Sequence, residues 1–99
     1  MNEVRRVTVI TDAALKDDVV DSVLKLGANG FTSWPCDGKG EHKTIGSPFA
    51  SGPGGVYIEF IVQPAVAETI VRHLHGPHYA QYAMTVYCQG VQVDAADKF

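Results

Sequence analysis

The sequence predicts an α+β fold, in which two helices cover one face of a four-stranded antiparallel sheet in the ferredoxin-like order βαββαβ. The chain has 99 residues, of which 45% are apolar, and this suits one compact domain over residues 1–99. Strand-like and helix-like periodicities follow each other in that order along the chain. Short right-handed crossovers favour this topology over the alternatives.

The first strand and the first helix follow directly from the periodicity. Residues 4–10 are rich in Val, Ile and Thr and predict a strand. Asp12 can cap the helix that follows. Apolar residues recur in that helix at steps of three and four: Leu15, Val19, Val20, Val23, Leu24 and Leu26. Gly27 is expected to end the helix, because glycine adopts a left-handed backbone without steric cost.

Residues 30–36 predict the second strand, which Pro35 places at an edge of the sheet because proline has no amide hydrogen to donate. From Asp37 onwards glycine, proline and serine predominate and the periodicity is lost. We therefore expect a long mobile loop over about residues 38–55. Loops of this length are uncommon in compact domains unless they bind something or are disordered.

The second half of the chain predicts a strand, a helix and a strand. Residues 56–62 form an apolar, β-branched and aromatic run, and Pro64 suits the start of a helix. An apolar stripe predicts that this helix continues to a Gly-Pro pair: Val66, Ala67, Ile70, Val71 and Leu74. Residues 84–93 predict the last strand, at the other edge of the sheet. Residues 94–99 are expected to fray, with Phe99 free to pack on a neighbour.

Alternation along residues 56–62 gives the sheet a buried face and an open face. It turns Ile58, Phe60 and Val62 toward the helices and leaves Tyr57, Glu59 and Ile61 on the open face. The sequence does not fix the register that decides whether Val7, Val9 or Trp34 shares the open face. Such a face is too apolar for a monomer, so we expect oligomerisation through it, with a cationic or hydrogen-bonding partner for Glu59 at the interface.

Charge and composition exclude several classes of function. The net charge is −3, from 8 Lys and Arg against 11 Asp and Glu, and no basic stripe is available for nucleic acid. No apolar run approaches the ~18 residues of a membrane span, and no apolar targeting core opens the chain, so we expect a soluble, cytoplasmic protein. Cys36 and Cys88 stand far apart in no metal-like spacing, which predicts two inert, reduced thiols.

Few residues offer chemistry of their own. Gly38–Lys39–Gly40 can present backbone amides and one cation to a phosphate, although it lacks the spacing of a P-loop. His73 and His75 point about 200° apart on a helix, which argues against a shared metal ion. Asp17 and Asp18 diverge by about 100°, and no nucleophile stands in a recognisable signature. We therefore expect a protein without enzymatic activity.

Three longer segments are informative as whole motifs: DDVVDSVLKLGANGFTSWPCDGKG, VYIEFIVQPAVAETIVRHL and YAMTVYCQGVQV. The most specific parts are Gly30–Phe31–Thr32 and Gly38–Lys39–Gly40, which border the long loop. From residue 4 to residue 93 the chain resembles the PII signalling superfamily, whose corresponding loop is called the T-loop. The resemblance is closest to the carboxysome-associated PII proteins, a PII-like branch tied to inorganic-carbon acquisition.

The resemblance implies a homotrimer with an adenine-nucleotide site in each cleft between neighbouring subunits. The glycine–lysine–glycine segment would contact phosphate, and Thr32 would approach the adenine from the adjacent subunit. The third predicted strand would line the base pocket, and two tyrosines would lie where the family's B-loop closes. The residues that the resemblance assigns to the nucleotide are Thr32, Gly38, Lys39, Gly40, Ile61, Val62, Tyr79 and Tyr82.

Departures from the family pattern narrow the choice of ligand. The glycine-rich B-loop and the downstream Arg-x-Arg segment of ordinary PII proteins are missing, and no tyrosine lies between Asp37 and Val56. The resemblance therefore implies ADP or AMP in preference to ATP, and no uridylylation. In the carboxysome-associated branch bicarbonate is the expected second ligand, and Lys39, Gly40 and His42 are its candidate partners. No metal cofactor is expected.

The function implied is that of a regulatory sensor. Ordering the backbone of residues 38–55 would cost on the order of 18–36 kcal/mol, whereas a micromolar ligand provides about 8 kcal/mol. The ligand would therefore fix the base of the T-loop, and a protein target would order the rest. That target would be a bicarbonate transporter or a carboxysome component, in the cytoplasm or at the carboxysome. A trimer that binds divalent cations and a purely structural trimer of the same topology are the alternatives.

Overall fold

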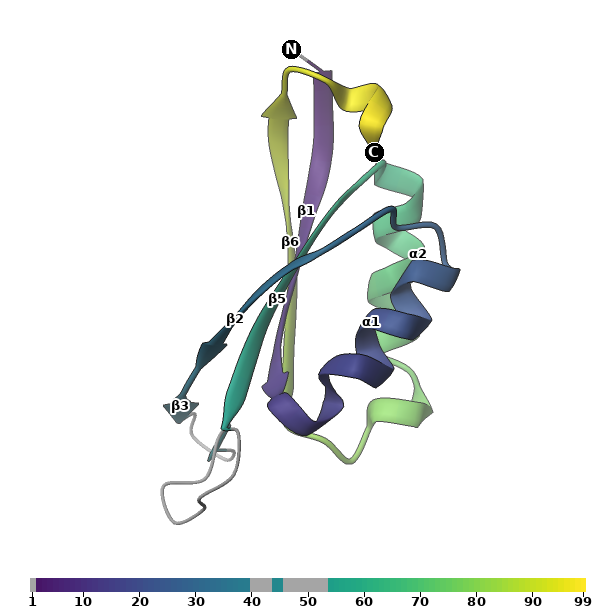
Figure 1. Ribbon diagram of the computed structural model, residues 1–99. Coiled ribbons are helices and arrows are strands. Elements are labelled where there is room, and N and C mark those ends of the chain that lie inside the picture. Colours follow the sequence, from purple (N-terminus) through teal and green to yellow (C-terminus); the bar gives the residue numbers. More distant parts are fainter. Residues whose placement is uncertain (1, 40–43, 46–53) are drawn as a thin grey trace.

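The computed structural model describes residues 2–39, 44–45 and 54–99. Its main sheet has four antiparallel strands in the order β2-β5-β1-β6, and both helices cover one face (Figure 1). The predicted fold class is confirmed, with the expected edge strands at the two edges. The elements are β1 (Asn2–Asp12), η1 (Ala13–Leu15), α1 (Lys16–Lys25), β2 (Thr32–Cys36), β3 (Gly38–Lys39), β4 (Thr44–Ile45), β5 (Gly55–Val62), α2 (Pro64–Leu74), η2 (Pro77–Tyr79), β6 (Met84–Val93) and η3 (Ala96–Lys98).

The entry into the first helix differs from the prediction. Asp12 still pairs with Gly55 in the sheet, and its side chain makes no capping hydrogen bond. The chain instead turns through the 3-10 helix η1, and the Ala13 amide at its start donates a hydrogen bond to the Gly54 carbonyl at 2.8 Å. The predicted end is confirmed. Gly27 has a φ of 122° and its amide donates to the Leu24 carbonyl at 3.2 Å.

Two further stretches differ from the expectation of irregular chain. Within the expected loop, β3 and β4 pair as a short antiparallel ribbon, Gly38 with Ile45 and Lys39 with Thr44. The rest of the loop lies outside the described residues. The tail that was expected to fray folds into η3 instead, and Ala96 is buried there.

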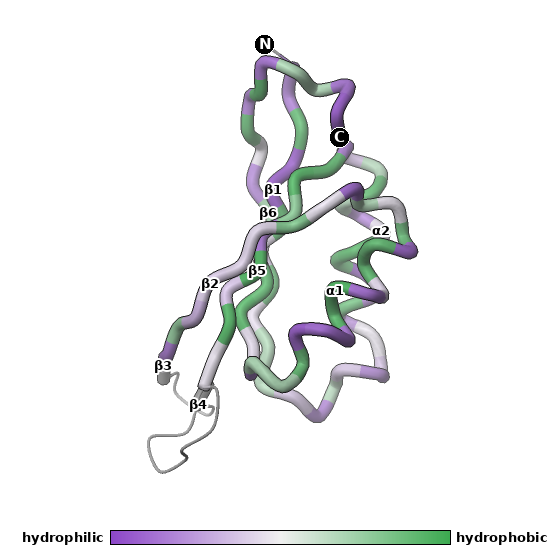
Figure 2. Tube along the Cα trace, in the orientation of Figure 1, coloured by the Kyte–Doolittle hydropathy of each residue, from purple (hydrophilic) through white to green (hydrophobic). Residues whose placement is uncertain are grey.

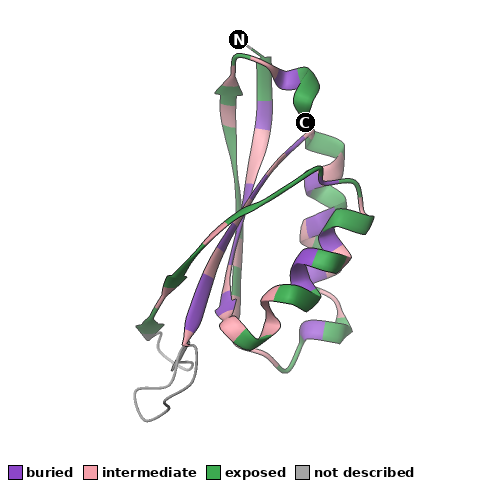
Figure 3. Ribbon diagram, in the orientation of Figure 1, coloured by how far each residue is buried: buried purple, intermediate pink, exposed green. Residues whose placement is uncertain are grey.

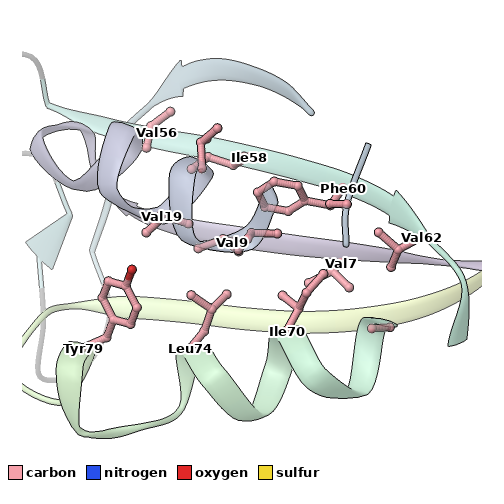
Figure 4. Close-up of a cluster of buried hydrophobic side chains, with 14 residues drawn as sticks. Val7, Val9, Val19, Val56, Ile58, Phe60, Val62, Ile70, Leu74 and Tyr79 are labelled. Atoms are coloured by element: carbon pink, nitrogen blue, oxygen red, sulfur yellow. The ribbon is translucent and has the colours of Figure 1, made fainter. Parts of the chain in front are cut away.

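The core lies between the sheet and the two helices (Figure 4). Burial alternates along β5, so that every second side chain from Val56 to Val62 is buried. Val7 and Val9 pair with Phe60 and Ile58 and are fully buried. They therefore belong to the helix-covered face, and their placement on the open face, which the sequence had allowed, is wrong. The helices present their buried side toward the sheet and their exposed side outward (Figure 3).

The open face carries a mixed aromatic and polar surface. Trp34 stacks on Tyr57, with ring centroids 4.2 Å apart, and Tyr57 Oη lies 3.4 Å from Thr8 Oγ1. Tyr87 pairs with Thr8 across the β1–β6 ladder, and Tyr87 and Trp34 are 40% and 44% exposed. Along the strands, hydrophobic and hydrophilic residues alternate (Figure 2). The open face predicted for Tyr57 and its neighbours on β5 is thus present, and the register, which the sequence left open, places Trp34 on it as well.

Candidate functional site

The first candidate site is a pocket of about 300 Å³ at the edge of the sheet where β2 begins, which we term the β2-edge pocket. Two residues assigned to the nucleotide, Thr32 and Ile61, both line it. The fold brings them together because Thr32 pairs with Glu59 across the β2–β5 ladder, two residues from Ile61 on the same face of β5. Its lining residues are Asn29, Gly30, Phe31, Thr32, Glu59, Ile61, Lys98 and Phe99.

Glu59 gives the β2-edge pocket a carboxylate. Its Oε1 lies 3.7 Å from Nε of Arg6 on the neighbouring strand, and the Glu59 side chain is 23% exposed. Arg6 also donates a hydrogen bond to the side chain of Gln89. The cationic partner that Glu59 was expected to find at an interface is therefore supplied by its own chain. A carboxylate has several acceptor positions, so Glu59 can in principle accept a hydrogen bond from a ligand amino group in addition to its contact with Arg6.

The second candidate site is a pocket of about 610 Å³ at the opposite edge of the sheet, which we term the β6-edge pocket. It lies between the C-terminal end of α2, the α2–β6 connector and β6. It contains the other pair of predicted residues, Tyr79 and Tyr82. Its lining residues are Val71, Leu74, His75, Tyr79, Ala80, Tyr82, Met84, Thr85 and Val86.

The α2–β6 connector is attached to α1 by two contacts. Tyr79 is 2% exposed, and its Oη lies 3.2 Å from Ser22 Oγ. Burial is the main cause that raises the pKa of the Tyr79 hydroxyl. His78 Nε2 lies 3.1 Å from an oxygen of Asp18 in an exposed pair. The Tyr79 ring is thus a core residue that contributes only part of its surface to the β6-edge pocket.

The remaining predicted residues lie elsewhere. Val62 is fully buried and points into the core (Figure 4), and it lines neither pocket. Gly38 and Lys39 form β3, beyond the far end of β2 from Thr32. The six steps from Thr32 to Gly38 span about 20 Å at ~3.3 Å per residue. Gly40 and His42 lie outside the described residues.

A third pocket, of about 400 Å³, lies between α2 and the β1–β6 side of the helix-covered face. It contains Arg5, Arg72 and the exposed thiol of Cys88. Cys36 and Cys88 are both unpaired. In the described part of the chain, no group of three or more His, Cys, Asp or Glu side chains is placed to hold a metal ion. Nor does that part contain a helix long and apolar enough to cross a bilayer.

The sequence of residues 4–97 matches the family described as Nitrogen regulatory protein P-II. The chain belongs to the P-II family. The resemblance to the PII superfamily is thereby confirmed, while the link to carboxysomes stays a prediction. No curated protein is significantly similar in sequence.

Solved structures of P-II-like proteins share the fold. A chain from Thermus thermophilus, assigned as a PII-like signaling protein, is 27% identical with a TM-score of 0.81, over 97% of this chain and 94% of that one. CPII from Thiomonas intermedia K12, bound to ADP and bicarbonate, is 18% identical with a TM-score of 0.79, over 93% and 89%. A DUF3240 family protein from Shewanella baltica is 15% identical with a TM-score of 0.72, over 95% and 96%. At 18% and 15% identity, the last two structures show only that the fold is shared.

Several lining residues of the β2-edge pocket were missed as site residues. Glu59 gave a signal, because it is a charged residue inside an apolar strand and faces the open side of the sheet. Asn29 precedes the family motif Gly30–Phe31–Thr32 and Phe31 lies within it, so both could have been included on that ground. Lys98 and Phe99 gave no usable signal, because only the folding back of the C-terminal segment brings them to β2.

Proposed function

We propose that this P-II protein is a regulatory sensor that binds ADP or AMP in clefts between copies of the chain. The observation that carries the proposal is the division of the predicted ligand residues between two pockets at opposite edges of one sheet. Thr32 and Ile61 line the β2-edge pocket, whereas Tyr79 and Tyr82 line the β6-edge pocket. If the β2 edge of one copy meets the β6 edge of the next, the two half-sites form one cleft.

The open face supports assembly as a homotrimer. Four large hydrophobic side chains are exposed among the residues that the structure describes. Trp34 and Tyr87 lie on the open face, Phe31 lies at the β2-edge pocket, and Leu24 lies on α1. Clusters of exposed aromatic side chains, such as Trp34 stacked on Tyr57, mark interaction sites in soluble proteins. Burying this face between copies removes the aromatic rings from water and brings the sheet edges of neighbouring copies together.

The pockets favour a nucleotide with few phosphates. Lys98 is the only lysine or arginine lining the β2-edge pocket, and none lines the β6-edge pocket, as far as the described residues extend. Each phosphate group brings additional negative charge that must be paired or kept in water. AMP and ADP therefore suit the site better than ATP. The CPII structures from Thiomonas intermedia K12 include complexes with ADP and AMP, which supports this choice.

We propose bicarbonate as the second ligand, held by Lys39, Gly40 and His42 at the base of the T-loop. CPII binds bicarbonate together with ADP, which supports the pairing. Bicarbonate has about four heavy atoms, and at about 1.5 kcal/mol per atom its affinity has a ceiling of tens of micromolar. A weak site of this kind suits the sensing of an abundant metabolite.

The output of the sensor is proposed to be the conformation of the T-loop, about residues 38–55. This segment begins with β3, directly after β2, and β3 pairs with β4. A ligand bound at Lys39 therefore acts at the start of the segment. A ligand shifts such an equilibrium by its differential affinity for the two loop states. The protein that reads the loop is proposed to be a bicarbonate transporter or a carboxysome component.

Isothermal titration calorimetry with AMP, ADP, ATP and bicarbonate tests the proposal. We expect saturable binding of AMP and ADP, weaker binding of ATP, and a bicarbonate affinity that changes when a nucleotide is present. Absence of saturable heat with every nucleotide would remove the proposed function. Titration with zinc or copper distinguishes the alternative, a trimer that binds divalent cations. That alternative predicts a shift in melting temperature with the metal and none with ADP.

A further inference from the structure

The C-terminal segment, residues 94–99, has a defined position on the fold. It turns back from the end of β6 toward the start of α2 (Figure 1). Two side-chain amides hold it, because Asn29 Nδ2 donates to the Lys98 carbonyl at 3.0 Å and Gln63 Nε2 donates to the Ala96 carbonyl at 2.9 Å. Ala96 is 8% exposed, and Val4 on the neighbouring β1 is fully buried. This segment is therefore a packed part of the domain.

The packed segment forms one wall of the β2-edge pocket. Lys98 and Phe99 both line that pocket, together with Glu59 from the sheet. Glu59 is largely shielded from solvent, with a side-chain exposure of 23%, whereas Lys98 is exposed. The lining of the pocket thus combines a partly shielded carboxylate with an exposed lysine.

A nucleoside monophosphate or diphosphate suits a pocket lined by Glu59 and Lys98, because its base carries hydrogen-bond donors and its phosphate is negatively charged. The amino group of the base can donate a hydrogen bond to the carboxylate of Glu59, and the aromatic side chains of Phe31 and Phe99 offer apolar contact to the base. The phosphate is the most strongly hydrated part of the ligand and suits the exposed Lys98. A hydrogen bond between ammonium and phosphate is charge-assisted and among the stronger contacts in a binding site.

We propose that Lys98 binds the first phosphate of the nucleotide. Gln63 is a positioning residue, because its hydrogen bond to η3 fixes the place of the segment that carries Lys98. The inference rests on the proposed function and adds to it a specificity-determining residue outside the motifs that the resemblance assigned. Gln63 does not line the pocket, so its effect on the ligand passes through the segment that it anchors.

The test compares AMP with adenosine, which has the same base and sugar and no phosphate. Binding of both probes is measured by calorimetry on the full chain. For Lys98→Gln we expect the AMP affinity to fall about tenfold or more while the adenosine affinity is unchanged. Lys98→Arg retains the charge and should keep most of the AMP affinity. Lys25→Gln, an exposed lysine at the end of α1 that lines none of the three pockets, is the matched control.

The positioning role has its own readout. Gln63→Ala should reduce AMP affinity and leave adenosine affinity nearly unchanged, because it releases the segment without removing a pocket residue. Gln92→Ala, an exposed amide on β6, is its control. An unchanged AMP affinity in Lys98→Gln, or an equal loss of AMP and adenosine, overturns the assignment while the sensor proposal stands. A wild-type protein that binds neither probe overturns both.

Discussion

At the scale of single residues, two phenylalanines illustrate how position decides the role of a side chain. Phe60 is fully buried in the core, and Phe31 is 43% exposed at the β2-edge pocket with the Lys16 ammonium 5.7 Å from its ring centroid. The same truncation should therefore affect stability at one position and ligand binding at the other.

We expect Phe60→Ala to lower the free energy of unfolding by about 3–5 kcal/mol, because it removes buried apolar surface and leaves a cavity. Phe31→Ala should cost less than about 1 kcal/mol and weaken AMP binding instead. Urea denaturation followed by circular dichroism measures the first effect and calorimetry the second. Equal losses of stability in the two variants would show that the core is placed incorrectly.

Tyr79 links a pocket residue to the pH dependence of stability. Burial raises the pKa of its hydroxyl in the folded state, whereas the unfolded chain ionises near pH 10. Above about pH 10 the unfolded state therefore releases a proton that the folded state retains, and stability falls as pH rises toward the folded pKa. Below about pH 10 both states are protonated and this contribution is fully present.

Tyr79→Phe should lower stability at neutral pH by about 1 kcal/mol, because the hydrogen bond with Ser22 is lost, and should make the decline above about pH 10 shallower. Ser22→Ala removes the same hydrogen bond but keeps the titrating hydroxyl, so its alkaline decline should remain. Urea denaturation between about pH 8 and about pH 11 compares the variants. An alkaline decline of wild-type steepness in Tyr79→Phe would contradict the assignment.

At the scale of elements, the end of α1 depends on one glycine. Gly27 has a φ of 122°, which an L-residue with a side chain rarely adopts. Gly30 has no such φ, and a Cβ added there would meet no atom within 4 Å. We expect Gly27→Ala to cost about 1–3 kcal/mol of stability, whereas Gly30→Ala should be nearly neutral. Thermal melts of both variants measure the difference, and an equally stable Gly27→Ala would refute the expectation.

The regular elements were predictable because their periodicity is local. The bounds of α2 and β6 agree with the predicted helix and strand, and alternation in β5 correctly separated its two faces. η1, the β3–β4 ribbon and η3 were not predictable. η1 and η3 are each held by a partner distant in sequence, the Gly54 carbonyl for η1 and the Gln63 amide for η3. The ribbon pairs residues close in sequence, but it lies in a stretch without strand periodicity.

The candidate site was predictable only in part, for the same reason. The family motif includes Thr32, and the register places it beside β5, so the structure brings Thr32 and Ile61 into one pocket. The contribution of Lys98 required the path of the C-terminal segment, which no local pattern encodes. The role of each site residue remains a prediction.

At the scale of the whole molecule, the open face should control assembly. We expect light scattering to report a mass three times the chain mass of 10.7 kDa for the wild type. Trp34→Asp should lower that mass, because it places a charge among aromatic side chains that assembly would bury. Leu24→Asp is the matched control, since Leu24 is 37% exposed on α1, away from the open face. A full-size Trp34→Asp assembly would exclude the open face as the interface.

In the proposed assembly, two copies of the chain complete each nucleotide site. A crystal structure of the protein with AMP tests it most directly. We expect the base of AMP in the β2-edge pocket of one copy, with residues of the β6-edge pocket of a neighbouring copy in contact with the same nucleotide. AMP held entirely within one chain, or a β2-edge pocket left empty at saturating AMP, would contradict it.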